Sequence, residues 1–531
     1  MVWNHGWREK AWRDLDQTWD LIIIGGGITG AGVFRQAIQA GLKTLLVDGH
    51  DFGAGTSSRS SKLVHGGLRY LKSAQLKLTL ESVREREYLL KEGRGLVNQL
   101  GFLYVRRQGD HMPGWIFGLG LCAYDLMARQ WLHRSYDTYD MQDLCPPLSC
   151  PELRGGYRYF DAQTDDARLV LRLIRESVEL GGQAMNYTRV TRLLQTRDGR
   201  VQGVLLQDTS GEESRTAEVK ANVVINATGV WVDQLRKQLG KPVRMRPLRG
   251  SHLILQQDRL PLTRAVTFLH PHDGRPVFAL PWEGVVLFGT TDLDHRTQLE
   301  IDPGIRGEEV DYLLQGLQQV FPAQDLDEND ITATFSGLRP VVNTGKIDPS
   351  KESREYAIWD ENGLVTVAGG KLTTFRLMAR DALKKACKYL PDNGSKAQRP
   401  AVFGNPQAAE GQDLKDHFSP AEQLRLLGRY SSDIVTGISR SDPADHQLIP
   451  GTLYSWAELR EIAPREAVVH LDDLLLRRLR LGLLLPKGGI ELIDQIGQVV
   501  RPALGWSDER WDREVQDYRQ LIQASYQVES G

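Results

Sequence analysis

A short apolar run followed at once by clustered glycines constrains this chain more than any other feature. Residues 21–24 are Leu-Ile-Ile-Ile, which suits a strand buried on both faces. Gly25, Gly27 and Gly30 follow in a GxGxxG pattern and open a predicted helix over residues 28–40. In that pattern the first glycine permits a tight turn, the second lets the backbone approach a pyrophosphate, and the third lets the helix pack closely on the strand. The sequence therefore predicts a parallel sheet that binds a dinucleotide at its edge.

A predicted acid and two later glycine junctions extend this site and favour one dinucleotide. Asp48 ends the second predicted strand, where a carboxylate would accept hydrogen bonds from a ribose. Residues 227–229, Ala-Thr-Gly, end a later buried strand, and residues 369–370, Gly-Gly, end another before a helix. The first glycine motif alone does not choose between NAD and FAD. Junctions so far apart favour an extended FAD, and backbone N–H groups after Gly370 would stabilise negative charge on the reduced flavin.

Composition and charge exclude several other classes of protein. Of the 531 residues 41% are hydrophobic and 25% charged, which is an ordinary balance for a globular protein. Lys and Arg total 66 and Asp and Glu total 68, so the formal charge is −2, which argues against a nucleic-acid-binding protein. The four cysteines form no CxxC pair, so we expect no metal site and no disulfide framework, and a reducing compartment fits best. No apolar run reaches the length of a membrane span.

The order of predicted elements gives an α/β fold with four parts along the chain. Residues 1–19 form an N-terminal extension, expected as a helix docked on the body through Trp7, Ala11, Leu15 and Trp19. Residues 20–390 hold a Rossmann-like FAD-binding domain, interleaved with an antiparallel-sheet substrate domain over about residues 95–150 and 245–330. A linker over 391–412 leads to a helical C-terminal domain over 413–531, in which residues 471–485 are the strongest predicted helix.

Several longer motifs resemble those of one enzyme family. Residues 56–71, TSSRSSKLVHGGLRYL, are the most specific of them. Others follow in the family's order at residues 165–169, 249–252, 289–292, 336–340, 369–376 and 471–478. In these motifs the chain is similar to the FAD-dependent glycerol-3-phosphate dehydrogenases, and it resembles the aerobic, single-chain bacterial type because a Cys-rich extension and an EF-hand loop are not seen. Asp48 departs from the family pattern, in which many members carry Glu.

The resemblance implies a reaction, a cofactor and a substrate site. It implies that sn-glycerol 3-phosphate is oxidised to dihydroxyacetone phosphate, that hydride passes from C2 to N5 of a non-covalently bound FAD, and that a membrane quinone then takes the electrons. A phosphate dianion calls for permanently charged donors, which Arg presents in a fixed fork. Five side chains are placed on the substrate by the resemblance: Arg69, Tyr70, Arg339, Lys371 and Thr374.

A proton acceptor is needed because loss of the C2 hydride leaves a hydroxyl proton. A base of near-neutral pKa suits this step, and His is the natural side chain. Of the 12 histidines only His65 and His252 fall inside the family's motifs. We expect His252, on a predicted strand of the substrate sheet, to act as the base together with Arg339 in the catalytic site. His65 and Arg339 stay open as alternatives for the base, and a purely structural histidine is the other interpretation of both rings.

The remaining motif residues are expected to bind the cofactor. Polar side chains of the serine-rich loop would line the diphosphate and ribityl chain, and the glycine junctions would supply backbone N–H groups. The full set is Gly25, Gly27, Ile28, Thr29, Gly30, Asp48, Thr56, Ser57, Ser58, Ser60, Lys62, Leu63, His65, Val190, Ala227, Thr228, Gly229, Gly370, Lys371, Leu372 and Thr373.

A quinone dissolves in the bilayer, so its enzyme needs contact with the membrane surface rather than a span. Candidate contacts are the Trp-rich N-terminus, residues 115–124, and the basic clusters at 241–249 and 477–480. We expect a cytoplasmic protein, peripheral on the cytoplasmic face of the inner membrane. Oxygen as acceptor and a homodimer stay open.

Two other functions fit a flavin-binding chain but agree less well with its residues. The first is an amine or amino-acid oxidase of the same flavin fold that passes electrons to oxygen, and Arg69 and Arg339 argue against it. The second is a flavin-containing RNA-modifying protein, which the −2 charge argues against.

Overall fold

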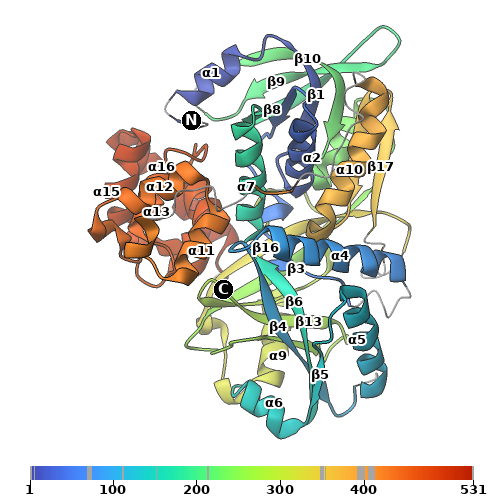
Figure 1. The fold of residues 1–531 in the computed structure, drawn as a ribbon, viewed down its shortest axis with the longest axis vertical. Helices are drawn as coiled ribbons and strands as arrows, with labels where there is room; N and C mark the ends of the chain where they lie inside the picture. Colours follow the sequence, from blue (N-terminus) through green and yellow to red (C-terminus); the bar gives the residue numbers. More distant parts are fainter. Residues whose placement is uncertain are drawn as a thin grey trace.

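Two sheet-based lobes and a helical unit make up the chain in the computed structural model, which describes residues 3–4, 6–68, 75–110, 113–150, 152–211, 214–346, 352, 355–390, 401–404 and 413–528. In Figure 1 one lobe lies above the other, and the helical unit, in orange and red, lies to the left. The upper lobe is built on an eight-stranded sheet and the lower lobe on a ten-stranded sheet. Each lobe takes segments that are far apart in the sequence, as the mixed colours of both sheets show.

The upper sheet has five parallel strands in the order β18-β10-β1-β2-β7. Their bounds are Leu364–Gly369 (β18), Thr216–Asn226 (β10), Thr18–Ile24 (β1), Thr44–Val47 (β2) and Gln183–Met185 (β7). Antiparallel strands complete the sheet: Tyr356–Glu361 (β17) on β18, and the hairpin of Thr188–Gln195 (β8) and Val201–Asp208 (β9) on β10. The carboxyl ends of the parallel strands meet at one edge, so the glycine junctions and the acid predicted after them meet there too.

Side chains of β1 pack alternately on the two faces of this sheet. Leu21 and Ile23 join the core under the helices Ile28–Gln39 (α2), Asp166–Glu179 (α7) and Phe375–Ala386 (α10). Ile22 and Ile24 pack on the opposite side, with side chains of the β8–β9 hairpin. All four are at most 5% exposed. A strand covered on both faces has no position for a polar side chain, which explains the continuous apolar run.

The N-terminal helix is shorter than predicted. Trp7–Arg13 (α1) ends before Leu15, and Trp19 lies on β1, so the four-residue spacing does not follow a single helix. Leu15 and Trp19 are still buried, because the strand brings Trp19 into the same apolar cluster. Trp3 is buried as well, beside Phe52. The segment docks on the body as expected, and these two tryptophans are not exposed to a membrane.

The lower sheet is mostly antiparallel, in the order β15-β11-β14-β13-β12-β4-β6-β3, with β16 on β11 and β5 on β6. Its strands are Leu63–Val64 (β3), Val97–Arg107 (β4), Arg134–Tyr136 (β5), Leu153–Thr164 (β6), Met245–Gln256 (β11), Ala265–Leu269 (β12), Pro276–Trp282 (β13), Val285–Gly289 (β14), Leu293–Asp294 (β15) and Ile331–Val342 (β16). Strands β6 and β16 lie outside the ranges assigned to the substrate domain from the sequence. Around the sheet lie four helices: Leu76–Glu92 (α4), Gly114–Ala128 (α5), Thr138–Leu144 (α6) and Gly307–Val320 (α9).

The C-terminal unit is helical and begins after the gap at residues 405–412. Its helices are Pro420–Arg429 (α11), Ser432–Arg440 (α12), Trp456–Ile462 (α13), Leu481–Leu484 (α14), Ile493–Leu504 (α15) and Asp508–Ser525 (α16). Residues 471–485 are not the single helix that was predicted. A π-helix, Asp473–Arg478 (η12), is followed by Arg480 at φ 59°, and this left-handed residue separates it from α14.

Buried arginines fasten this unit to the upper lobe. Arg478 donates to Asp51 at 2.8 Å, and Arg168 of α7 donates to Glu466 at 2.7 Å. Arg477, Arg478 and Arg480 are at most 2% exposed. The basic cluster at 477–480 therefore binds carboxylates inside the protein, and its expected contact with a membrane is wrong.

Of the predicted linker over 391–412, only residues 401–404 lie in the described part of the chain. Val402 and Phe403 are buried in the core of the upper lobe. Among the residues that the structure describes, no helix has both the length and the apolar character needed to cross a membrane.

Candidate active site

The glycine-rich turn joins β1 to α2 at the carboxyl edge of the upper sheet. Gly25 has φ 104°, and a Cβ there would lie 2.6 Å from the carbonyl oxygen of Ala227. A Cβ on Gly30 would overlap the carbonyl oxygen of Gly25, and one on Gly27 would lie 3.0 Å from Ser57 Oγ. At Gly25 and Gly30 a side chain would overlap backbone, and at Gly27 it would press on Ser57, so the turn is a backbone cradle of the predicted kind.

The first turn of α2 lies at the glycine turn and has no cap from its own N-cap residue. No side chain caps this helix at its N-cap residue Gly27. The N–H of Ile28 donates to Ser57 Oγ at 2.9 Å, and Thr29 is partly exposed beside it. Ser57 thus occupies the N–H of Ile28, and the positive end of the helix dipole at this turn favours a bound phosphate.

Asp48 follows β2 and faces the glycine turn. Its Oδ2 accepts the N–H of Gly26 at 2.6 Å, and its Oδ1 accepts the N–H of His50 at 2.9 Å. Burial raises the pKa of Asp48 to about 7, because the two backbone donors only partly compensate the carboxylate for lost hydration. Its carbonyl oxygen accepts the N–H of Thr188 at the start of β8, and the partly exposed Val190 follows two residues later on that strand. Ribose hydroxyls that donate to this carboxylate would favour its ionised form.

The serine-rich loop, residues 56–62, connects the glycine turn to the lower sheet. Thr56 Oγ1 donates to the carbonyl oxygen of Leu338 on β16 at 2.5 Å. Ser58 is buried, and Ser60 Oγ donates to Asp166 of α7 at 2.7 Å. Leu63, which begins β3, is also buried. The loop thus touches both lobes, with Ser57 against the glycine turn and Thr56 against β16.

The side chain of Lys62 points into the protein interior rather than toward the glycine turn. It is completely buried, and Nζ donates to Ser58 O at 2.5 Å and to Asp166 at 2.8 Å. Burial lowers the pKa of Lys62 to about 8, although Asp166 opposes the shift. Arg480 of the C-terminal unit pairs with both Asp165 and Asp166. Only the backbone of Lys62 is therefore left for the predicted cofactor contact, and its ammonium holds the loop.

The junction after β10 lies against the first one. The N–H of Ala227 donates to Ile24 O at 2.8 Å, and Thr228 Oγ1 donates to Asn226 Oδ1 at 2.8 Å. Gly229, at φ 61°, begins the short helix Gly229–Trp231 (η2), which contacts β16. The residues predicted here therefore lie between the glycine turn and the lower sheet.

The junction after β18 lies beside His65. Gly369 and Gly370 have φ 78° and 88°, which a residue with a side chain rarely adopts. They lead into the short helix Leu372–Thr374 (η6), whose Thr373 donates through Oγ1 to His65 O at 3.3 Å. The structure thus brings the late glycine pair to the HGG segment, about 300 residues earlier in the sequence.

Lys371 and Thr374 differ in how far they reach out of this junction. Lys371 is partly exposed, and its Nζ lies 3.4 Å from Ser82 Oγ of α4. Thr374 is 3% exposed, and its hydroxyl donates to Lys371 O at 3.4 Å within the same turn. Lys371 is therefore accessible to a ligand, and the hydroxyl of Thr374 is occupied in the turn.

Arg339 on β16 is held by the turn that follows β14. Its Nη1 donates to Asp292 Oδ1 at 2.6 Å and to Thr291 O at 3.2 Å, and its Nη2 donates to Thr290 Oγ1 at 2.8 Å. A Cβ on Gly250 of β11 would overlap the guanidinium, so the strand passes directly beneath it. The side chain of Arg339 keeps 27% of its surface exposed, against 2% for Asp292. The pair presents a fixed guanidinium whose acid partner is buried behind it.

His252 lies two residues after Gly250 on β11. Its ring stacks on Phe335 with centroids 4.6 Å apart, and Nε2 lies 2.8 Å from Ser61 Oγ. Burial, and then the positive charges of Arg339 and Lys62, lower the pKa of His252 well below its ordinary value, so the ring is neutral. It is only 2% exposed. His252 has the charge state of a base but little access to a ligand, whereas His65 is partly exposed.

Three side chains that the sequence did not point to hold the HGG segment. The N–H of Gly66 donates to Asp161 Oδ1 at 3.0 Å. Asp161 also accepts Arg86 at 2.7 Å and the hydroxyl of Tyr124 at 2.8 Å. These residues come from β6, α4 and α5, and no motif links them in the sequence. The buried acid fixes the backbone next to His65.

The predicted residues therefore form two adjoining groups. The glycine turn, Asp48, Ser57 and the β10 junction lie at the edge of the upper sheet, and Arg339 and His252 lie on the lower sheet with residues 290–292. The hydrogen bond from Thr56 to β16 joins the two groups. Arg69 and Tyr70 lie outside the described residues.

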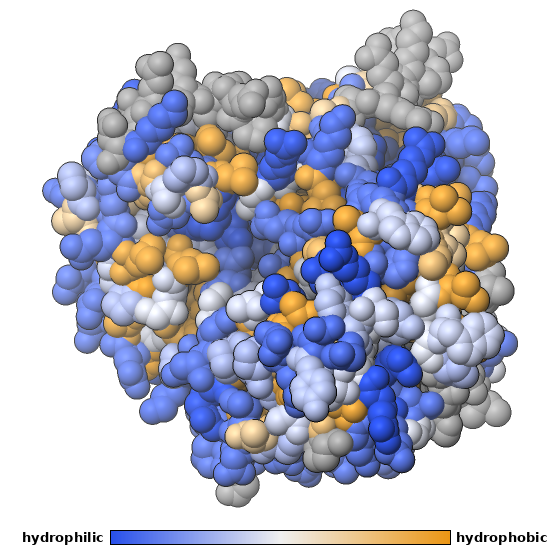
Figure 2. Space-filling view, turned by 60° about the horizontal axis from the view of Figure 1, so that its bottom comes forward, coloured by the Kyte–Doolittle hydropathy of each residue, from blue (hydrophilic) through white to orange (hydrophobic). Residues whose placement is uncertain are grey.

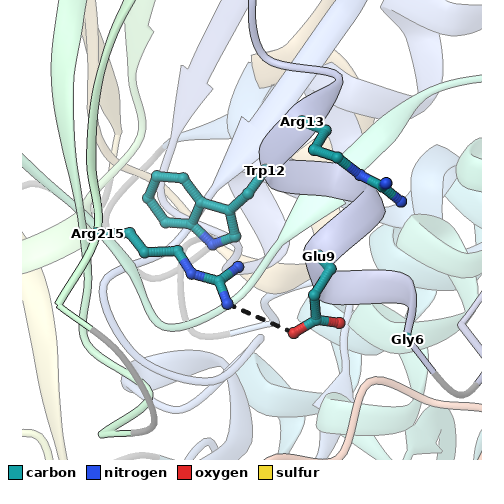
Figure 3. A pocket seen from close by; sticks show the side chains of 5 residues that line it. All are labelled: Gly6, Glu9, Trp12, Arg13 and Arg215. Atoms are coloured by element: carbon teal, nitrogen blue, oxygen red, sulfur yellow. Dashed lines mark ion pairs between the residues drawn. The ribbon is translucent and has the colours of Figure 1, made fainter.

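A wide surface hollow lies away from both groups. It has a volume of about 710 Å³ and is lined by Gly6, Glu9, Trp12, Arg13 and Arg215. Figure 3 shows these residues, with an ion pair between Arg215 and Glu9 of α1 that is 3.5 Å long. None of its residues belongs to the motifs, and we do not assign it to the active site.

Comparisons with known proteins agree with this geometry. Residues 20–376 match the family model of FAD dependent oxidoreductases, and residues 396–511 match the C-terminal domain of alpha-glycerophosphate oxidase. Glycerol-3-phosphate dehydrogenase 2 of Mycobacterium tuberculosis is 34% identical over 97% of this chain and 90% of its own length. Aerobic glycerol-3-phosphate dehydrogenase of Bacillus subtilis is 36% identical over 82% and 78%. The chain belongs to the FAD-dependent glycerol-3-phosphate dehydrogenase family.

A solved structure extends the likeness to the whole fold of this dehydrogenase. The glycerol-3-phosphate dehydrogenase of Bacillus halodurans, complexed with FAD, superposes with a TM-score of 0.76 at 26% identity, covering 98% of this chain and 97% of that one. The predicted fold class, with its helical C-terminal domain, is confirmed. Because these matches extend through the C-terminal domain, they support the dehydrogenase better than an amine or amino-acid oxidase.

FAD, the cofactor of this family, fits the residues of the dehydrogenase. The glycine turn is a cradle that a Cβ would fill, and the uncapped start of α2 suits the pyrophosphate. Asp48 is placed for a ribose, and the backbone after Gly370 is placed beside His65 for the flavin ring. One extended ligand could contact all three junctions, because the parallel strands end at the same edge.

Proposed function

We propose that this protein oxidises sn-glycerol 3-phosphate to dihydroxyacetone phosphate on FAD and passes the electrons to a membrane quinone. The observation that carries the proposal is Arg339, whose guanidinium is fixed by Asp292 and Thr290 on the sheet that the serine-rich loop contacts through Thr56. Relatives named for glycerol 3-phosphate support the choice of substrate.

Recognition of the phosphate needs fixed positive charge that is still exposed. Arg339 meets this need, because its acid partner Asp292 lies on the buried side and 27% of the arginine side chain faces outward. A guanidinium with five N–H donors can hold Asp292 and still donate to a phosphate oxygen. Lys371, and Arg69 by the sequence motif, are proposed as the further cations of this site.

Removal of the hydride requires an acceptor and a base. FAD, when bound, accepts the hydride from C2 and carries two electrons to the next acceptor. The backbone N–H groups of residues 370–373, at the start of α10, are proposed to stabilise the negative charge that results. We propose His65 ahead of His252 as the proton acceptor, because His65 is partly exposed beside Thr373 and His252 is enclosed against Ser61.

The location follows from the two reactants. Glycerol 3-phosphate is water-soluble and the quinone lies in the bilayer, so the proposal places the protein on the cytoplasmic face of the inner membrane. Two chains could share one patch of membrane as a homodimer, and light scattering of the purified protein would measure this.

Bleaching of the flavin tests the reaction directly. The purified protein is mixed anaerobically with glycerol 3-phosphate, glycine or sarcosine, and the yellow absorbance is followed. We expect glycerol 3-phosphate alone to bleach it. Reoxidation by a water-soluble quinone analogue, compared with oxygen, then identifies the acceptor. A flavin that stays oxidised with glycerol 3-phosphate would overturn the proposal.

The base is assigned by a matched pair of variants. His65→Asn is expected to slow flavin reduction by glycerol 3-phosphate by about 100-fold or more, as loss of a general base does. His252→Asn should leave most of that rate, provided that the variant still binds FAD. The reverse result would return the role to His252.

A further inference from the structure

A buried carboxylate, Glu309, joins the helix α9 to three segments of the lower sheet. It lies in the first turn of α9 and is 1% exposed. Its Oε1 accepts the hydroxyl groups of Ser251 at 2.8 Å and of Thr291 at 2.7 Å. Its Oε2 accepts Arg249 at 2.7 Å, and Ser336 Oγ lies 2.7 Å from Ser251 Oγ. These five residues are called the Glu309 cluster below.

The Glu309 cluster lies inside the lower lobe, among apolar side chains. Figure 2 brings the bottom of Figure 1 forward, and hydrophilic residues cover much of the visible surface. The members of the cluster do not belong to that surface, because each is at most 4% exposed. Leu253, Phe288 and Leu313 pack in the same layer, between the sheet and α9. A buried ion pair adds little net stability compared with apolar side chains in its place, so stability alone does not account for the cluster.

The cluster and the guanidinium of Arg339 lie on opposite faces of the same sheet. Gly250 and Ser251 are consecutive on β11, so their side-chain positions point to opposite faces. A Cβ on Gly250 would overlap the guanidinium of Arg339, whereas the hydroxyl of Ser251 donates to Glu309. Any effect of Glu309 on a ligand at Arg339 therefore has to pass through the strands between them.

Thr291 connects the two faces. It is the middle residue of the turn 290–292, which holds the guanidinium of Arg339. Its carbonyl oxygen accepts Arg339 Nη1 at 3.2 Å, and its hydroxyl donates to Glu309 at 2.7 Å. The same hydroxyl accepts the N–H of Ser251 at 2.9 Å. The turn that fixes the guanidinium on one face is thus itself fixed by a carboxylate on the other face.

The carboxylate sets the direction of the hydroxyl hydrogen bonds around it. Because Glu309 is paired with Arg249, its carboxylate only accepts hydrogen bonds. Thr291 and Ser251 each carry one hydroxyl proton, and both protons therefore point at Glu309. The Ser251 oxygen then accepts the hydroxyl of Ser336, and the Thr291 oxygen is left to accept a backbone N–H. An apolar side chain at position 309 would leave the hydroxyl of Thr291 without this fixed direction.

We propose that Glu309 is a positioning residue of the substrate site. Through the hydroxyl of Thr291 it holds the turn that presents Arg339 to the phosphate of the substrate. The inference rests on the proposed function, in which Arg339 binds that phosphate. It gives the first turn of α9 a role in substrate affinity, and no role in FAD binding or in proton transfer.

A matched pair of variants at Thr291 separates the effect of the hydroxyl from that of the side-chain shape. Thr291→Val keeps the branched shape and removes the hydroxyl, whereas Thr291→Ser keeps the hydroxyl. Flavin reduction by glycerol 3-phosphate is followed anaerobically by stopped flow. We expect Thr291→Val to raise the half-maximal concentration about tenfold, with normal FAD content and an unchanged maximal rate, and Thr291→Ser to stay within about twofold of wild type. Thr267→Val, at another buried threonine of the same sheet, is the control and should behave like wild type.

A double-mutant cycle tests whether Thr291 acts through Arg339. Arg339→Met alone is expected to raise the half-maximal concentration about 100-fold, and adding Thr291→Val should then have no further effect. Independent roles would instead multiply to about 1000-fold. Glu309→Gln should match Thr291→Val, and the two together should be no worse than either alone, because both break the same connection. Multiplied effects, loss of FAD in Thr291→Val, or a Thr291→Ser variant weaker than Thr291→Val would overturn the inference.

Binding of inorganic phosphate, measured by titration calorimetry, separates this inference from the proposed function. Phosphate carries the group that Arg339 is proposed to bind, and its binding needs no reaction of the flavin. Suppose that glycerol 3-phosphate leaves the wild-type flavin oxidised, but Thr291→Val weakens phosphate binding only when Arg339 is present. The proposed function is then wrong, and the positioning role stands. If the flavin is bleached and Thr291→Val binds phosphate like wild type, the function stands and the positioning role is wrong.

Discussion

The two sheets contribute to one site by different means. At the edge of the upper sheet the proposed FAD site is built from backbone: Gly25 and Gly30, where a Cβ would overlap a carbonyl oxygen, and the first turn of α2, whose N-cap glycine supplies no side-chain cap. On the lower sheet the proposed substrate site is built from side chains, of which Arg339 is held by Asp292 and Thr290 from a different strand connection. A backbone site depends on where glycine stands in the sequence. A side-chain site depends on which strands lie side by side. The number of residues that separate its members in the sequence can therefore vary more.

The glycine turn and the first turn of α2 form the backbone half of the proposed site, and the lower-sheet side chains form its side-chain half. Loss of a single glycine from the backbone half is expected to have the largest effect on FAD binding. In Gly30→Val the side chain would overlap the carbonyl oxygen of Gly25, so α2 cannot pack on β1 and the phosphate cradle is lost. We expect the purified protein to contain no FAD, measured by its absorbance. Gly307→Val is the control, because a Cβ at Gly307 has nothing within 4 Å. If Gly30→Val protein still contains FAD, the claim that the backbone of the glycine turn forms the FAD site is wrong.

A distant side chain supports the backbone half, and its removal is expected to have the next largest effect. Arg480 pairs with Asp165 and Asp166, and Asp166 in turn holds the serine-rich loop through Ser60 and Lys62. Arg480→Met leaves buried carboxylates short of positive charge, which should lower the free energy of unfolding by about 3 kcal/mol. Urea unfolding followed by flavin release measures it.

The control for that variant is an exposed ion pair of the same unit. Arg460 pairs with Asp445 while 43% of its side chain is exposed. Arg460→Met should change stability by less than about 1 kcal/mol. Equal effects of the two variants would show that the helical unit does not support the serine-rich loop.

Removal of the Asp48 carboxylate is expected to have the smallest effect on FAD binding, and that effect depends on pH. Its pKa is raised to about 7 in the protein without ligand, so it is mostly protonated below that pH, and this protonation stabilises the folded state there. Ribose donors favour the ionised form, so binding of FAD should release a proton. Affinity for FAD should therefore rise by up to about tenfold per pH unit until about pH 7 and then level off.

Asp48→Asn should remove that slope and weaken binding above pH 7 by about 1.5–3 kcal/mol, since a hydrogen bond to a charged group is lost. Titration of the apoprotein with FAD at several pH values measures both effects. A slope that survives in Asp48→Asn would assign it to another group.

Local spacing made the backbone half predictable. The apolar run, the glycines and the acid at the end of β2 are all within 30 residues, and the later strand-to-glycine junctions repeat the same pattern. Parallel strands then bring these junctions to one edge, which follows from topology alone. The α/β class and the helical C-terminal domain could be predicted for the same reason.

Burial of charge could not be predicted, because the partners are far apart in the sequence. Lys62 and Asp166 are 104 residues apart, and Arg478 and Asp51 are 427 apart. Without those partners a lysine in a serine-rich loop suggests a phosphate ligand, and a run of arginines suggests a membrane contact. The prediction that Trp19 lies on the N-terminal helix was wrong for another reason. Trp19 stands four residues after Leu15, as on a helix, but it lies on strand β1.

The central claim is that the upper-sheet backbone binds FAD and the lower-sheet side chains bind the substrate. Reduction of the flavin in Arg339→Met tests it most directly. Anaerobic stopped-flow absorbance gives the FAD content and the glycerol 3-phosphate concentration at half-maximal reduction rate. Arg296→Met is the control, because Arg296 follows β15 and its side chain is 87% exposed. The account predicts normal FAD content in both variants and, for Arg339→Met alone, a half-maximal concentration about 100-fold higher, since about 3 kcal/mol of charge-assisted hydrogen bonding is lost. An unchanged half-maximal concentration, or loss of FAD together with substrate binding, would contradict it.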